Sequence, residues 1–251
     1  MLRSDLRHPL TRLCQQRSSW LRVNEAFPAR PAVGEKTVGD SVSARVAAAL
    51  DRRRLGDTPF TVVASDCWGG AAYKALGREY NTPFVGLFVE PDDFARLTSD
   101  LEGYLAAELR FIDSDEPYPV AMLGGDVQLN FMHYASEEEA RAKWDRRRKR
   151  MDWDAIRVCA RAKDARGKVI SGVVRQHTPG ALVLGPAELA GGGVLGVRNH
   201  QESGQRLYDM SLQEFDVVTW LADNRIVRPR RYQLALHGLS RLKRRLKGAV
   251  P

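Results

Sequence analysis

A short run of reactive and flexible residue types, Ser65-Asp66-Cys67-Trp68-Gly69-Gly70, lies in the first third of the chain. It follows an apolar, β-branched run at 60–64, which predicts a buried strand, and it precedes a predicted helix over 71–80. Ligands of open α/β sheets bind where strands end and helices begin, because the free N–H groups of the helix attract anions. A thiol at such a helix start also tends to have a lowered pKa.

This run has two interpretations. In the first, Cys67 is a catalytic nucleophile and the loop cradles an anionic ligand. The candidate ligand-binding residues are then Ser65, Asp66, Trp68, Gly69 and Gly70. In the second, Cys67 and Trp68 pack in the core and the glycines form a turn. The glycine spacing does not match the dinucleotide-binding fingerprint.

A histidine and a tyrosine, His133 and Tyr134, end a strand predicted over 127–134, just ahead of a helix. Histidine titrates near neutral pH, so His133 is the second candidate catalytic residue, as a general base, and Tyr134 is a candidate ligand-binding residue. The alternative is a hydrogen-bonded histidine at a sheet edge. We expect this strand to end at the same edge of the sheet as Cys67, so that both face one pocket.

A highly charged helix is predicted from the capping pair Ser136 and Glu139 to about Met151. Trp144, Arg147 and Met151 are spaced i, i+3 and i+7, which places the arginine on a face with apolar neighbours. An arginine held in this way often binds a carboxylate or a phosphate. Trp144 and Arg147 are therefore candidate ligand-binding residues, and a solvated basic helix face is the alternative interpretation.

Alternating strand and helix patterns predict an α/β fold, a layered domain with a mostly parallel central sheet flanked by helices. Besides the segments above, strands are predicted at 84–89, 111–112, 120–123, 156–160 and 181–184. Helices are predicted at 42–50, 91–109 and 212–221. Pro91 opens the second of these helices, with two acidic residues in its first turn.

The composition is typical of a globular protein, because 43% of the 251 residues are hydrophobic and 28% are charged. No apolar stretch approaches the ~20 residues that cross a bilayer, and the N-terminal residues lack the apolar core of a secretory signal. The three cysteines, Cys14, Cys67 and Cys159, are widely spaced and fit neither a disulfide framework nor a zinc pattern. No metal site is predicted, and the expected location is cytoplasmic.

The net charge of +8 is concentrated at one end of the chain. Residues 225–251 contain nine of the 39 Lys and Arg and no acid, which leaves 30 basic and 31 acidic residues for the rest. Five leucines between 234 and 246 fit an amphipathic helix among these cations. The predicted organisation is an irregular extension at 1–56, an α/β domain at 57–224 and a basic amphipathic tail at 225–251. A poorly ordered, solvated terminus is the alternative for the tail.

Several motifs in a fixed order resemble a bacterial family that is catalogued as a domain of unknown function and often labelled exopolysaccharide biosynthesis protein. They are SDCWGG at 65–70, YNTPF at 80–84, YP at 118–119, LGGD at 123–126, FMHY at 131–134 and KWDRR at 143–147. The resemblance extends from about residue 60 to about residue 184. It implies an α/β fold and a role in surface polysaccharide synthesis, without catalytic roles. The family usually has Asn before the cysteine, where this chain has Asp66, a carboxylate that would oppose an anionic ligand unless a cation pairs with it.

The expected function is a transferase that transfers or modifies a sugar unit during exopolysaccharide or capsule assembly. Its partner would be a glycan precursor or nucleotide sugar, and its cofactors are unknown. The alternative is a non-catalytic scaffold or binding protein that the tail at 225–251 holds, as a peripheral protein, against the anionic inner face of the cell membrane. The absence of a recognition motif beside the basic residues argues against a nucleic-acid partner.

Overall fold

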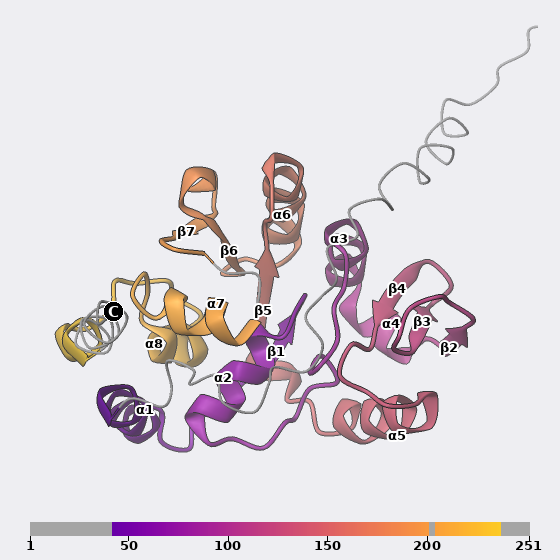
Figure 1. The fold of residues 1–251 in the computed structure, drawn as a ribbon, viewed down its shortest axis with the longest axis horizontal. Coiled ribbons are helices and arrows are strands. Elements are labelled where there is room, and N and C mark those ends of the chain that lie inside the picture. Colours follow the sequence, from indigo (N-terminus) through magenta and orange to yellow (C-terminus); the bar gives the residue numbers. More distant parts are fainter. Residues whose placement is uncertain (1–41, 201–203, 237–251) are drawn as a thin grey trace, which may run out of the picture. The chain divides into compact units, whose positions relative to one another are not determined.

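The computed structural model describes residues 42–200 and 204–236, and these residues belong to one compact unit (Figure 1). The helices are α1 (Val42–Leu55), α2 (Trp68–Leu76), α3 (Pro91–Ser99), α4 (Leu101–Ala106), α5 (Glu137–Arg148), α6 (Ala165–His177), α7 (Gly204–Ser211) and α8 (Val217–Asp223). The strands are β1 (Thr61–Ala64), β2 (Leu109–Ile112), β3 (Val120–Leu123), β4 (Val127–Asn130), β5 (Ile156–Arg161), β6 (Leu182–Pro186) and β7 (Leu195–Val197).

The strands form two sheets. Four parallel strands lie in the order β1-β5-β6-β7, and a small antiparallel sheet has the order β2-β3-β4. Helices pack around the parallel sheet (Figure 1). The predicted α/β fold with a mostly parallel central sheet is therefore confirmed, with a second, antiparallel sheet beside it.

Alternate residues of the parallel strands enter two different cores, as the period of a strand requires. Val63 and Val158 face a core that also contains residues of α3, α5, α6 and the small sheet. Val62 and Cys159 face the other core, which α1, α2, α7 and α8 cover. Because both faces are buried, these strands read in the sequence as continuous apolar runs.

The segment 84–89, predicted as a strand, is not one, and it instead links the two sheets. Phe88 makes one isolated antiparallel bridge to Asn130 of β4, and the Val89 N–H donates to the Ser65 carbonyl at 2.9 Å. The segment thus touches β1 on one side and β4 on the other without forming a ladder. Its five apolar residues and one glycine have the composition of a buried strand, and composition alone does not distinguish a strand from a buried connecting segment.

Helix boundaries differ from the predicted ones where polar caps interrupt the apolar period. The predicted helix 91–109 is two helices, because Asp100 ends α3 and its carboxylate accepts the Gly103 N–H at the start of α4. The predicted helix 212–221 begins after α7 has ended, and it is helical only from Val217, in α8, because Asp216 caps α8 by accepting the N–H groups of Val218 and Thr219. Helices α6 and α7 and strand β7 were not predicted.

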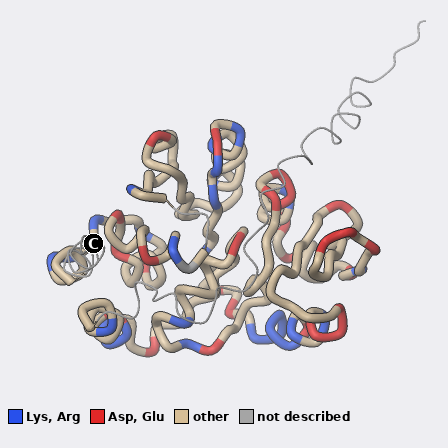
Figure 2. The backbone as a smooth tube through the Cα atoms, in the orientation of Figure 1, with Lys and Arg blue, Asp and Glu red and all other residues tan. Residues whose placement is uncertain are grey.

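The charged helix α5 follows its prediction closely. Ser136 accepts the Glu139 N–H at 3.2 Å, and Glu139 reaches back to the Ala135 N–H at 2.8 Å. Acidic residues fill its first turn and basic residues its last, in line with the helix dipole (Figure 2).

Much of the two predicted terminal segments lies outside the described residues. Within the segment 1–56, residues 42–55 form α1, which packs against α2 and α8. Within the tail at 225–251, residues 225–236 are described. Cys14 and the leucines beyond residue 236 are not described.

Candidate functional site

The run from Ser65 to Cys67 lies where β1 ends and α2 begins, at the carboxyl edge of the parallel sheet. The Asp66 carboxylate accepts the Trp68 N–H at 2.9 Å, which fixes the first turn of α2. Ser65 is buried, and its hydroxyl accepts the Arg161 N–H of the neighbouring strand at 3.2 Å. The loop is therefore anchored to β5, which ends beside it at the same edge.

Asp66 is paired with a cation, Arg161, at the end of β5. The Arg161 Nε atom lies 3.4 Å from Asp66 Oδ2, and both side chains are only 8% exposed. The geometry is that of an ion pair without an aligned hydrogen bond, and Oδ2 accepts no other hydrogen bond within the described residues. The Arg161 guanidinium thus offsets the repulsion that the Asp66 carboxylate would exert on an anionic ligand.

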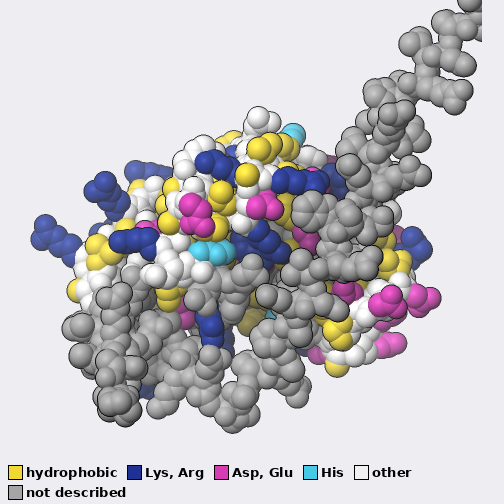
Figure 3. All heavy atoms as spheres, turned by 45° about the horizontal axis from the view of Figure 1, so that its top comes forward, with side chains coloured by type: hydrophobic (Ala, Val, Ile, Leu, Met, Phe, Trp, Pro, Cys, Tyr) yellow, Lys and Arg dark blue, Asp and Glu magenta, His cyan; other side chains and the backbone are white. Residues whose placement is uncertain are grey.

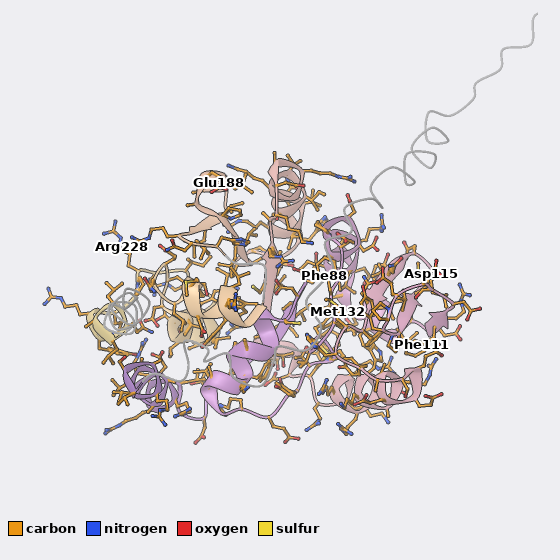
Figure 4. All side chains as sticks on the ribbon, in the orientation of Figure 1. Phe88, Phe111, Asp115, Met132, Glu188 and Arg228 are labelled. Atoms are coloured by element: carbon orange, nitrogen blue, oxygen red, sulfur yellow. The ribbon has the colours of Figure 1, made fainter. Side chains whose placement is uncertain are left out.

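An aromatic ring and a second cation complete this edge. The guanidinium carbon of Arg161 lies 5.9 Å from the centre of the Phe88 ring, and Lys163 Nζ lies 4.5 Å from it. Lys163 is exposed and Phe88 is half-buried. Figure 4 shows Phe88 and Met132 at the junction between the two sheets. We call Ser65, Asp66, Phe88, Arg161 and Lys163 the β1–β5 edge cluster.

The cavity directly behind this edge is small. It has a volume of about 10 Å³, room for about one water molecule. The lining residues include Ser65, Arg161 and Ser171 together with apolar side chains of α3 and α6. A sugar or nucleotide would therefore have to bind on the outer side of the edge.

Cys67 is half-buried, and its thiol is poorly suited to ionise. Burial and the neighbouring Asp66 carboxylate raise the pKa of Cys67 to about 12, although Arg161 acts in the opposite direction. The start of α7 lies against it, since a Cβ atom at Gly204 would come 2.5 Å from Cys67 Cβ. Cys159 is fully buried, and burial raises its pKa well above the ordinary value. The expected lowering of the thiol pKa at the helix start is outweighed by desolvation.

Trp68 and the two glycines serve the packing of α2. Trp68 is completely buried against Tyr208 and Trp220, and its indole N–H donates to the Ser211 hydroxyl at 3.1 Å. A Cβ at Gly69 would come 2.9 Å from Ala64 Cβ, so only glycine lets α2 approach β1 this closely.

Gly70 has a similar setting, because a Cβ there would meet Val85 at 3.2 Å. These contacts account for the residue types at 68–70 without a ligand. A ligand-binding role for Trp68, Gly69 and Gly70 stays a prediction.

His133 and Tyr134 lie on the opposite side of the segment 84–89 from Ser65. His133 is exposed, and its backbone N–H donates to the Gly86 carbonyl at 3.0 Å. The Tyr134 side chain is buried, and its hydroxyl donates to the Val85 carbonyl. Burial raises the pKa of Tyr134, although the Arg147 guanidinium acts in the opposite direction. Within the described residues, no hydrogen bond joins Cys67 to His133 or to Tyr134.

Arg147 is a buried cation. It is 8% exposed, it donates to the Tyr134 hydroxyl at 2.8 Å, and its guanidinium lies 5.0 Å from the centre of the Tyr80 ring. No carboxylate forms an ion pair with it in the described part of the chain. Trp144 shares its helix face, as predicted, but is fully buried against Phe84.

Sequence reasoning missed Arg161, Lys163 and Phe88. The signal that could have found Arg161 is its position directly after the apolar run at 156–160, which matches that of Ser65 after the run at 60–64. Parallel neighbouring strands end at the same sheet edge, so these residues meet.

A second polar cluster, also missed, ties residues 230–233 to α1 and α8. The buried Asp51 carboxylate accepts hydrogen bonds from Tyr232 and Gln233, and the buried Asp216 carboxylate accepts from Arg54 at 2.7 Å. Burial raises the pKa of Asp51. For Asp216 burial acts in the same direction, but hydrogen bonds from Arg54 and Thr219 hold its pKa below the ordinary value.

Surface charge is mixed. On the face shown in Figure 3, basic and acidic side chains are interspersed where the described atoms are visible. Over residues 42–200 and 204–236, no helix has both the length and the apolar content that crossing a bilayer requires. In that same part of the chain, no three or more His, Cys, Asp or Glu side chains are grouped to hold a metal ion.

The fold and the edge cluster define an α/β protein with a polar strand-end site, and comparison with known proteins places it in a family. The chain belongs to the family described as domain of unknown function DUF1919, whose model matches residues 39–172. The match includes the edge cluster and Arg147, and it ends within α6.

A relative described as an uncharacterized protein of Haemophilus influenzae (strain ATCC 51907 / DSM 11121 / KW20 / Rd) is 35% identical to this chain over 113 residues. The alignment covers 45% of this chain and 54% of the relative, so the match spans about half of each.

Proposed function

We propose that this protein is a transferase of exopolysaccharide or capsule assembly that binds an anionic, activated sugar at the β1–β5 edge cluster. One observation carries the proposal: the buried Asp66–Arg161 pair, with Lys163 and the Phe88 ring beside it, at the carboxyl edge of a parallel sheet. Guanidinium and ammonium groups bind phosphate oxygens, and an aromatic face offers an apolar surface for a sugar ring. The resemblance of the motifs to polysaccharide biosynthesis proteins supports the choice of a sugar.

Each residue of the edge would then have a separate task. Arg161, fixed by Asp66, and the exposed Lys163 would bind the phosphate groups of a nucleotide sugar. Asp66 Oδ2 is buried and accepts no hydrogen bond within the described residues, and after a rearrangement of the edge on binding it would accept one from a sugar hydroxyl. A hydroxyl of the acceptor would attack the anomeric carbon, and the bond from that carbon to the diphosphate would break.

His133 would take the proton of the attacking hydroxyl, because it is the exposed imidazole across the segment 84–89 from Ser65. The exposed Lys163 would hold the charge of the leaving diphosphate, and Arg161, whose own charge Asp66 offsets, would donate hydrogen bonds to it. A thiol whose pKa lies at about 12 is almost entirely protonated at neutral pH. Cys67 is therefore proposed as part of the wall of the site and not as a nucleophile.

Binding of nucleotide sugars tests the proposal. A panel of nucleotide sugars is added to the purified full chain, and the shift in melting temperature and the heat of binding are measured. We expect at least one compound to bind, with affinity at least 10-fold weaker in Lys163→Glu. Lys149→Glu is the matched control, because Lys149 is exposed and lies just after α5. Binding by no compound, or equal losses in the two variants, would reject the transferase.

Polymer yield in cells tests the catalytic assignments separately. His133→Ala should abolish polymer formation, whereas Cys67→Ser should preserve it. Normal polymer in His133→Ala would remove the base from the mechanism while leaving the binding site in place. Loss of polymer in a stably folded Cys67→Ser would restore the thiol as a catalytic candidate.

The second candidate is a non-catalytic scaffold that the tail at 225–251 holds at the anionic inner face of the membrane. Four exposed arginines between 225 and 231 favour it. Removal of residues 237–251 should then abolish polymer formation without affecting nucleotide-sugar binding. A truncated protein that still supports polymer formation would exclude the scaffold.

A further inference from the structure

Residues 227–233 are held firmly to the body by the cluster around Asp51 and Asp216. The Asp216 N–H donates to the Val227 carbonyl at 2.9 Å, and Gln233 donates to both carboxylates, at 3.0 Å to Asp51 and 3.3 Å to Asp216. Arg230 Nε lies 3.3 Å from Asp216. This segment therefore has a fixed path along α8, and side chains that it does not use for attachment project from a defined backbone.

The segment and the end of α8 line a wide, open groove on the surface. The groove is lined by Asp216, Thr219, Asp223, Arg225, Val227, Arg228, Pro229, Arg230, Arg231 and Tyr232. Arg228 lies on the α8 side of the molecule, away from Phe88 of the edge cluster (Figure 4).

The charges in this groove are unbalanced. Asp216 is almost fully buried and already paired with Arg54 and Arg230. Arg225, Arg228 and Arg231 are exposed, and none of the three forms an ion pair or a side-chain hydrogen bond within the described residues. Asp223 is the acid left in the lining to oppose an anion. Three guanidinium groups that have no ion-pair partner among the described residues, against the one carboxylate of Asp223, give the groove a net positive charge.

We infer that this groove binds clustered phosphate groups, such as a diphosphate. Guanidinium groups present paired N–H donors that match phosphate oxygens, and three of them along one groove suit a ligand with more than one phosphate. The fixed backbone lowers the entropy lost on binding, since Pro229 and the bonds to Asp51 and Asp216 already hold it. The phosphates can come from a soluble diphosphate or from lipid headgroups at a membrane surface. The site is independent of the transferase proposed at the sheet edge.

The test compares two triple variants of the full chain. Arg225, Arg228 and Arg231 are changed to Ala in the first, and Arg110, Arg146 and Lys149 in the second. The control residues are exposed, lie on or next to β2 and α5, and lose the same charge. The five Lys and Arg at 241–247 remain in both proteins, so they contribute equally to both results.

Two probes at 0.15 M salt distinguish the sources of phosphate. Inorganic pyrophosphate is titrated by calorimetry, and flotation measures binding to vesicles of phosphatidylglycerol or of phosphatidylcholine. We expect the groove variant to lose at least 10-fold in affinity for one probe or both, and the control variant less than 2-fold. Loss confined to phosphatidylglycerol assigns the groove to lipid headgroups, and loss for pyrophosphate assigns it to soluble diphosphates. Equal behaviour of the two variants, or no binding of either probe to the unchanged protein, would overturn the inference.

Discussion

Replacing Asp66 with Asn separates the two tasks of this carboxylate. The amide oxygen of Asn can still accept the Trp68 N–H, so the cap of α2 is kept. The negative charge 3.4 Å from Arg161 is lost, and a cation whose side chain is only 8% exposed loses that partner. Asp66→Asn should therefore lower stability while it strengthens the binding of an anion at the edge.

The size of the stability loss follows from the burial of the pair. Two unit charges about 4 Å apart attract by roughly 4 kcal/mol at an effective dielectric constant near 20. Part of the lost attraction is offset because a neutral amide costs less to bury than a carboxylate. The free energy of unfolding of Asp66→Asn should therefore be lower by about 1–3 kcal/mol. For a domain of this size, a loss of about 2 kcal/mol lowers the melting temperature by about 4–8 °C.

Urea unfolding at pH 7 measures the loss, with Asp92→Asn as the control. Asp92 also pairs with an arginine, Arg166, but those side chains are 47% and 72% exposed. Exposed pairs contribute about 0–1 kcal/mol, so the control should change little. Calorimetry with a sugar phosphate should show tighter binding to Asp66→Asn. Equal stability of the two variants would refute the claim that the buried pair organises this edge.

Three further predictions concern packing, the thiol and pH. Gly69→Ala should destabilise the protein by about 1–3 kcal/mol in urea unfolding, because the new Cβ would lie 2.9 Å from Ala64 Cβ. Gly172→Ala should stabilise α6 by about 0.5–1 kcal/mol, because no atom lies within 4 Å of a Cβ added at position 172. A Gly69→Ala variant more stable than Gly172→Ala would contradict the packing argument. Iodoacetamide at pH 8 should alkylate Cys67 roughly 1,000-fold more slowly than it alkylates a free thiol, because the pKa of Cys67 is about 12. Peptide mass spectrometry measures the rate, and an ordinary rate would show an accessible thiolate. The folded protein lowers the pKa of Asp216, so this carboxylate stabilises the fold above its ordinary pKa of 3.8, and the stabilisation is lost as the pH falls through the pKa of the folded state. When the free energy of unfolding is measured against pH in the acid range, it should therefore fall less steeply for Asp216→Asn than for the unchanged protein. An unchanged slope would show that Asp216 does not contribute.

The sequence predicts the parts of this fold that depend on local pattern. The apolar runs at 60–64, 156–160 and 181–184 become parallel strands because both of their faces are buried. The capping pair of α5 and Pro91 of α3 are local signals, and both appear where expected. Segment 84–89 differs because its partners, Ser65 and Asn130, are fixed by the tertiary arrangement.

The candidate site was predicted less completely, for a related reason. Ser65 and Asp66 follow a predicted strand, and this correctly predicts that they lie at the sheet edge. The cation that pairs with Asp66 is Arg161, which lies 95 residues further along the chain. The position of Arg161 after an apolar run indicates a strand end, but its pairing with Asp66 also needs the order of the strands in the sheet, which local sequence patterns do not give. The expected low pKa of Cys67 followed from its helix-start position, and burial together with the Asp66 carboxylate outweighs that effect.

The arrangement at the edge limits which ligand it can favour. The carboxylate that holds Arg161 in place also cancels its charge, so the remaining full positive charge of the edge cluster is that of Lys163. One ammonium group and the N–H groups at the start of α2 attract a phosphate only weakly at physiological salt. Selectivity must then come from hydrogen bonds, and the acceptor proposed for a hydroxyl donor is Asp66 Oδ2, a buried atom that a ligand would reach only after the edge rearranges. A sugar phosphate should therefore bind more tightly than inorganic phosphate, and the preference should shrink in Asp66→Asn, whose amide oxygen is a weaker acceptor than a carboxylate.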